Sequence, residues 1–225
     1  VLLVRRHVAY VECRRLAGMR IPDTHIRLLD DAGSLRPVIV QQAVPDDMMM
    51  QVLFRQASLS GAIGLLDRIA ADVADVWRRV AHRPERIGLH AQIERFGMDE
   101  EGPLFLDTFP PLISYDRTEM GHLIQRFADS GLIRGLGKIL PGRVRDVQDR
   151  WYTPAGSIST LLDGAVRLRP QDQEPLMDWA TEFAATRLEG PWRNALEAQL
   201  ARQARLHAGR RPGWGGLAGR DRPHA

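Results

Sequence analysis

The strongest periodic signal in this sequence begins at Ser58 or Ser60 and ends at Val80. Within it, an apolar residue recurs every three to four positions: Leu59, Ile63, Leu66, Ile69, Val73, Val76 or Trp77, and Val80. Charged residues lie mostly between them, which is the pattern of a helix with one apolar face and one solvent face. The sequence therefore predicts an amphipathic helix of about six turns. The helix must end before Pro84, because a proline cannot sit inside a continuing helix.

The segments on both sides of this helix change to the two-residue period of β-strands. Two pairs of short apolar runs, each pair flanking a turn rich in Asp and Gly or Glu, predict two β-hairpins: residues 25–29 with 37–42, and residues 95–98 with 103–107. Residues 86–90 predict a further short strand after the long helix. Ahead of the first hairpin we expect a helix over residues 5–16 that stops at Gly18.

The second half of the chain is expected to be helical. The apolar spacing predicts three helices: residues 118–128 with a cap at Ser130 and Gly131, residues 172–188, and residues 192–207. Pro191 suits the first position of the last helix, since its missing N–H costs nothing there. The Gly-, Pro- and Arg-rich residues 208–225 predict a disordered tail. We therefore predict an α+β fold in three parts: residues 1–44, a helical part over 45–207, and the tail.

Charge and cysteine content exclude several classes of protein. The formal net charge is only +3 and acidic residues are spread along the chain, so nucleic acid is not an expected partner. The single cysteine, Cys13, excludes an internal disulfide and a cysteine-rich zinc site. No apolar run approaches the about 18 residues that a bilayer span requires. The apolar start at Val1–Val4 is too short for a signal peptide. We therefore expect a cytoplasmic protein that does not bind membranes.

The order of the elements is a helix, a hairpin, a proline-containing connector, a long helix, a loop, a hairpin ending in Asp, and further helices. Together with the segments 87–98 and 104–111, this order resembles the protein-kinase-like fold, in the branch of the aminoglycoside and other small-molecule phosphotransferases. The likeness covers roughly residues 8–200. It implies a partial N-terminal lobe over residues 1–44 and a mostly helical C-terminal lobe. It also implies phosphoryl transfer from ATP to a hydroxyl of a small molecule or a modified peptide.

The resemblance assigns roles to several residues. Asp107 would bind Mg²⁺, because a carboxylate at a strand exit can point at the phosphates of a nucleotide. The adenine of ATP would lie against the backbone of four residues: Gln41, Gln42, Ala43 and Val44. Glu12, on the first helix, would be the acidic partner of the family's strand lysine.

Two positions depart from the family pattern. His90 stands where the family has its catalytic Asp, and histidine can accept a proton in its place. Arg95 stands where the family has a magnesium-binding Asn; a guanidinium has only donors, so it cannot bind the metal but can contact a phosphate. Gln92 offers an oxygen ligand in the same loop. No lysine precedes Lys138, and no cluster of closely spaced glycines opens the chain. If Val1 is a truncation point, the family's strand lysine and glycine-rich loop lie upstream of it. If Val1 is near the true start, this is a lobe without a full ATP clamp.

Three alternatives stay open. The substitutions at positions 90 and 95 favour a non-catalytic, pseudokinase-type binding or scaffolding module on the same fold. A mononuclear metal hydrolase would use four residues whose spacing matches no familiar motif: His82, His90, Glu94 and Asp107. The individual residues also have structural interpretations, in which His90 is a hydrogen-bonded structural histidine, Asp107 caps a turn and Glu94 pairs with Arg95 in solvent.

Overall fold

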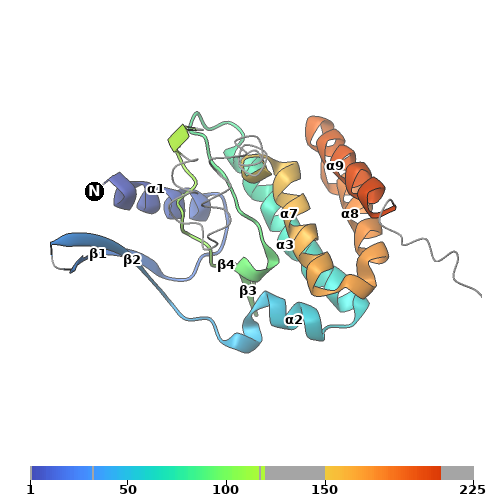
Figure 1. The fold of residues 1–225 in the computed structure, drawn as a ribbon, viewed down its shortest axis with the longest axis horizontal. Coiled ribbons are helices and arrows are strands. Elements are labelled where there is room, and N and C mark those ends of the chain that lie inside the picture. Colours follow the sequence, from blue (N-terminus) through green and yellow to red (C-terminus); the bar gives the residue numbers. More distant parts are fainter. Residues whose placement is uncertain (1, 32, 117, 120–149, 209–225) are drawn as a thin grey trace, which may run out of the picture.

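The computed structural model describes residues 2–31, 33–116, 118–119 and 150–208. Over these residues the chain is a mixed α/β protein with two small antiparallel sheets of two strands each, as the α+β prediction required. The first hairpin projects from one side of the molecule, and the C-terminal helices gather on the other (Figure 1). Most of the predicted helix over 118–128, Lys138 and nearly all of the predicted tail lie outside the described residues.

The first helix, α1 (Leu2–Leu16), confirms the helix predicted over residues 5–16 and begins three residues earlier. It stops where Gly18 takes a φ of +83°, a left-handed conformation that glycine adopts without a steric penalty. The buried side of α1 is unusually polar for a helix that lies on a core, because His7, Tyr10 and Arg14 are all 1% exposed or less.

The first hairpin joins β1 (Thr24–Asp31) to β2 (Ser34–Gln41) and confirms the predicted pair of strands. The strands are antiparallel, with Ile26 opposite Ile39. At the turn, the backbone N–H of Gly33 donates to Asp30 Oδ1 over 2.8 Å and Gly33 has a φ of +84°. This Asp–Gly pairing explains why the sequence marks the turn so clearly.

The connector after β2 contains a short helix that the sequence analysis missed. A 3₁₀ turn over Asp46–Met48 leads into α2 (Met50–Gln56), where Met50 and Phe54 are fully buried. These two residues, four positions apart, face the same side of one helical turn. A helix this short shows too few repeats to be recognised from periodicity.

The long helix α3 (Leu59–Val80) confirms the strongest sequence signal, and its predicted apolar stripe is largely buried. Ser58 caps its first turn, since the Ser58 side chain accepts from the N–H of Gly61 over 3.1 Å. The exposed fractions of Leu66, Ile69 and Val73 are all 0%, so this helix lies at the centre of the core.

The strand predicted over residues 86–90 is wrong. Only one isolated bridge, between Ile87 and Ile113, forms in this stretch. Beyond this bridge, the remaining backbone groups of Gly88 and Leu89 bond to side chains and to the carbonyl of Trp151, as described below, so the pairing does not continue into a strand ladder.

The second hairpin confirms its prediction. It pairs β3 (Phe96–Asp99) with β4 (Gly102–Phe105), and the rings of Phe96 and Phe105 lie 5.3 Å apart in the core. A 3₁₀ turn over Ile93–Arg95 leads into β3.

Three C-terminal helices complete the described fold: α7 (Pro154–Leu168), α8 (Gln173–Arg187) and α9 (Gly190–Ala208). The last two confirm the helices predicted over 172–188 and from Pro191. Figure 1 shows α7 running beside α3, with α8 and α9 on its far side. No helix among the described residues combines the length and the apolar character needed to cross a membrane.

Candidate functional site

Three of the predicted site residues come together at the mouth of the second hairpin. His90 Nδ1 lies 3.4 Å from Asp107 Oδ2, and Arg95 Nε lies 3.7 Å from the same oxygen. We call His90, Arg95 and Asp107 the Asp107 cluster. Two basic side chains that are 17 and 12 positions before Asp107 in the sequence thus share one oxygen of its carboxylate.

The pairing of β3 with β4 explains why Arg95 and Asp107 meet. Phe96 lies opposite Phe105 in the ladder. The pairing continues one step beyond the strands, because the N–H of Leu106 donates to the carbonyl of Arg95 over 2.9 Å. The hairpin register therefore places Arg95 beside the residue that precedes Asp107.

The backbone N–H groups just before His90 are bonded to two different segments. The N–H of Gly88 donates to the carbonyl of Leu112 over 2.7 Å, and the N–H of Leu89 donates to the carbonyl of Trp151 over 2.6 Å. The Trp151 side chain then lies against the imidazole of His90, with ring centroids 4.6 Å apart. The two backbone hydrogen bonds fix the chain just before His90, and the contact with Trp151 fixes the orientation of its ring.

The carbonyl groups of the same two residues are bonded by buried side chains. Tyr10 Oη donates to the Gly88 carbonyl over 3.3 Å, and Arg14 Nη2 donates to the same oxygen. Ser157 Oγ donates to the Leu89 carbonyl over 3.2 Å. All four polar backbone groups of Gly88 and Leu89 therefore have partners, and each partner comes from a different part of the chain.

The electrostatics of the cluster are those of a carboxylate between two basic groups. The Asp107 side chain is only 11% exposed, whereas Arg95 is 48% exposed and reaches solvent. Both contacts are longer than an ordinary N–H···O bond of about 2.7–3.2 Å. With Nδ1 of His90 directed at the carboxylate, its Nε2 is the nitrogen left for another partner.

The other residues of the loop are oriented differently from what the sequence suggested. The Glu94 carboxylate pairs with Arg167 of α7, not with Arg95, and Glu94 Oε2 is buried without a hydrogen-bond partner. The N–H of Gln92 donates to the His90 carbonyl over 3.1 Å, which closes the loop behind His90. Glu94 is thus engaged with α7 rather than with solvent.

The hydrolase alternative finds no support in this geometry. Across the described residues, no group of three or more His, Cys, Asp or Glu lies close enough to hold a metal ion. His82 is exposed at the end of α3, and Glu94 is bound to Arg167. The four residues required by that alternative do not form a ligand set.

The residues predicted to face adenine divide into two groups. The Gln41 side chain donates to Thr24 Oγ1 over 2.9 Å and to the carbonyl of Leu106 over 3.3 Å, so it contacts the residue before Asp107. Gln42, Ala43 and Val44 instead line a pocket of about 580 Å³, opposite the stretch 18–23. That pocket has no lining residue from the Asp107 cluster.

Glu12 lies in a second pocket, of about 590 Å³, between α1 and β1. Its lining is mostly apolar, with Val4, Val8 and Val11 on the helix side, and Asp107 does not belong to it. His7 also lines this pocket and connects it to the residue that follows Asp107, because His7 Nε2 lies 3.1 Å from the hydroxyl of Thr108. Burial lowers the pKa of the His7 imidazole, so His7 is neutral in the folded protein near pH 7.

Sequence reasoning missed the side chains that support the cluster. These supporting residues are His7, Tyr10, Arg14, Trp151 and Ser157. The first three are spaced three and four positions apart, so they occupy one face of α1. Polar residues at helical spacing were the available signal, but apolar periodicity alone does not detect them.

Known proteins add one finding to this geometry. No curated protein and no solved structure matches the chain. One family model matches residues 2–216, which is nearly the whole sequence. The chain therefore belongs to that family, which is described as a family of unknown function (DUF6206).

Proposed function

We propose that this chain is a kinase-like phosphotransferase domain, with the Asp107 cluster as its reaction centre. The observation that carries the proposal is the meeting of His90, Arg95 and Asp107 at the exit of a hairpin, within 3.4 and 3.7 Å. The donor is ATP, and the acceptor is a hydroxyl group of a small molecule or a modified peptide.

The proton chemistry falls to His90. Asp107 faces Nδ1, which fixes the imidazole and leaves Nε2 to accept the proton of an attacking hydroxyl. Trp151 limits rotation of the ring from the other side. Phosphoryl transfer depends mainly on positioning and on neutralising charge, so a histidine base in place of an aspartate is compatible with turnover.

The phosphate chemistry falls to Arg95 and Asp107. The half-exposed guanidinium of Arg95 can donate to a phosphate oxygen, and a charge-assisted bond of this kind is stronger than a neutral one. Asp107 is the single protein carboxylate of the cluster. Mg²⁺ commonly binds one or two carboxylates together with the phosphates of its substrate, so it would arrive with ATP.

Gln41 links this centre to the predicted adenine contact. Its side-chain amide reaches the Leu106 carbonyl, so the end of β2 is tied to the strand that leads to Asp107. Gln42–Val44 follow directly in the chain. Glu12, on α1, is proposed as the acidic partner of the family's strand lysine.

One observation favours a second candidate, a non-catalytic binding or scaffolding module. His90 and Arg95 both lie against Asp107 Oδ2, so the carboxylate that should hold the metal already has two basic neighbours. In that case the cluster is an internal ion-pair network, and nucleotide does not displace it.

Nucleotide-dependent stabilisation separates the two candidates. The melting temperature is measured with ATP alone, Mg²⁺ alone and both together. A ligand at about 100 times its Kd stabilises the folded state by about 2.7 kcal/mol, so a shift with ATP and Mg²⁺ supports the phosphotransferase. The shift should disappear in Asp107→Asn and Arg95→Lys. No shift with the unsubstituted protein would favour the non-catalytic module.

Exposed residues of the same types supply controls. Asp178→Asn on α8 and Arg68→Lys on α3 change the same chemical groups at exposed positions outside the cluster. His82→Gln is the control for His90→Gln, which should abolish any ATP hydrolysis measured with the unsubstituted protein and leave the nucleotide-dependent shift in place. Loss of the shift in the control variants would mean that nucleotide binds elsewhere.

A further inference from the structure

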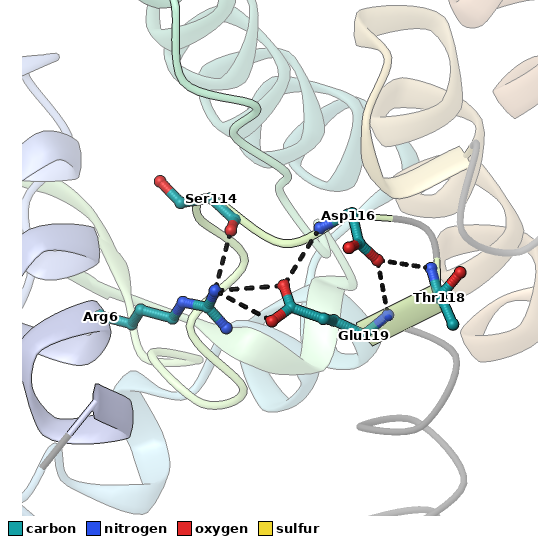
Figure 2. Close-up of polar contacts among 5 residues, drawn as sticks. All are labelled: Arg6, Ser114, Asp116, Thr118 and Glu119. Carbon is teal, nitrogen blue, oxygen red and sulfur yellow. Dashed lines mark hydrogen bonds and ion pairs between the residues drawn. The ribbon is translucent and has the colours of Figure 1, made fainter.

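A set of polar contacts fastens the segment after Asp107 to the first helix. Arg6 Nη2, on α1, donates to the Ser114 carbonyl over 3.1 Å and to Glu119 Oε2 over 3.1 Å (Figure 2). The Arg6 guanidinium also lies over the ring of Tyr115, 4.0 Å from its centroid. We call Arg6, Ser114, Tyr115 and Glu119 the Arg6 clasp. These contacts join residues 108 to 113 positions apart.

The far side of the clasp is itself ordered by a reciprocal cap. Asp116 Oδ1 accepts from the N–H groups of Thr118 and Glu119, over 2.8 and 2.7 Å. The N–H of Asp116 points back to Glu119 Oε2 over 3.4 Å (Figure 2). This is the arrangement of a capping box, in which two side chains satisfy each other's backbone donors. Glu119 is therefore held in place to receive Arg6.

The near end of the same segment is held by the next residue of α1. His7 Nε2 contacts the hydroxyl of Thr108, which directly follows Asp107. Thr108 is 2% exposed, so this contact is fully inside the protein. Arg6 and His7, which are neighbours on α1, thus contact the two ends of this segment: His7 contacts Thr108, and Arg6 contacts Ser114 and Glu119.

We propose that Arg6 is a positioning residue for the Asp107 cluster. By holding residues 114–119 on α1, the Arg6 clasp keeps Thr108 against His7 and therefore keeps Asp107 within reach of His90 and Arg95. Arg6 touches none of the three cluster residues in the contacts above, so it acts through the segment. The proposal deepens the proposed function, because it names what sets the geometry of that reaction centre.

The planar guanidinium is essential to this role. Arg6 uses one nitrogen for two acceptors and its flat face for the Tyr115 ring. A lysine has a compact ammonium on a flexible stem and cannot combine these contacts. Arg6→Lys should therefore release the segment nearly as much as Arg6→Met, although it keeps the charge.

Trp151 provides a readout that requires no nucleotide. Its ring lies 4.6 Å from His90 and it is outside the clasp. In protein labelled with 5-fluorotryptophan, the Trp151 signal is assigned with Trp151→Phe and followed by ¹⁹F NMR. Arg6→Met, Arg6→Lys and Glu119→Gln should all move or broaden this signal, and Arg6→Met with Glu119→Gln together should add little to either alone. Arg5→Met, at the exposed neighbouring position, is the control and should leave it unchanged.

The nucleotide assay gives a second readout. If the unsubstituted protein binds ATP and Mg²⁺, the Arg6 and Glu119 variants should bind them about threefold more weakly or worse. An unchanged Trp151 signal in Arg6→Met would overturn the positioning role. A moved Trp151 signal in a protein that does not bind ATP would instead support the positioning role and overturn the proposed function, so the two failures are distinguishable.

Discussion

Ser157 is the residue through which the core supports the loop before His90, and its removal gives a measurable prediction. The hydroxyl of Ser157 accepts from Trp77 Nε1 over 3.1 Å and donates to the Leu89 carbonyl over 3.2 Å. Ser157→Ala removes both bonds and adds no new group. It leaves one buried donor and one buried acceptor without partners.

The magnitude follows from those two groups. A buried polar group that loses its partner costs about 1–3 kcal/mol. Trp77 keeps 7% exposure, which allows its N–H some relief, so we expect a total destabilisation of about 2–4 kcal/mol. With an m-value of about 2 kcal/mol per M in urea, the midpoint should fall by about 1–2 M.

Urea unfolding followed by tryptophan fluorescence measures this change. Thr181→Ala is the matched control, because the Thr181 hydroxyl donates to a carbonyl of its own helix at an exposed position. The control should stay within about 0.5 kcal/mol of the unsubstituted protein. If Ser157→Ala is as mild as the control, the hydroxyl does not bridge α3, α7 and the loop, and the account of how His90 is positioned is wrong.

Three further predictions concern stability. The lowered pKa of His7 means that the unfolded chain binds a proton more readily than the folded one, so stability should fall as the pH drops below 6.5. In urea midpoints measured between pH 8 and 5.5, His7→Gln should reduce this dependence on pH. Hydrogen bonds from Arg20 lower the pKa of Asp99 from 3.8 to about 2. The contribution of Asp99 to stability is therefore complete above pH 3.8 and is lost as the pH falls through about 2. Asp99→Asn should remove this loss of stability from urea midpoints measured at acid pH. Leu66→Ala should destabilise the protein by about 2–5 kcal/mol in urea, because Leu66 is 0% exposed on the central helix, whereas Leu59→Ala, 37% exposed on the same helix, should cost much less.

The elements that the sequence predicted well are those with repeated local signals. The helix from Leu59 to Val80 repeats its apolar stripe over many turns, and both hairpins have turns whose residues favour that geometry. In the Asp107 cluster, Asp107 stood out as a polar residue after an apolar strand, whereas His90 and Arg95 were named only through the family resemblance. Each of these features lies within a short stretch of chain.

The parts that were missed depend on contacts between distant segments. Residues 86–90 have the composition of a strand, but the groups that bond to Gly88 and Leu89 come from α1, α7, the loop at Leu112 and Trp151. The polar face of α1 was missed for the same reason. A buried arginine such as Arg14 can be predicted only when its partner is known, and that partner, the Gly88 carbonyl, lies 74 positions away. The pairing of Glu94 with Arg167 spans 73 positions and has no local signal either.

The four bonded backbone groups at Gly88 and Leu89 have a consequence for how the protein opens. Because each group is attached to a different element, this stretch cannot detach without also loosening α1, α7 and the loop at Leu112. Local fluctuations, which expose amides in ordinary loops, should not reach it. The amide of Leu89 should therefore exchange its hydrogen only when the whole domain unfolds, and the loop should behave as part of the most slowly exchanging unit of the molecule.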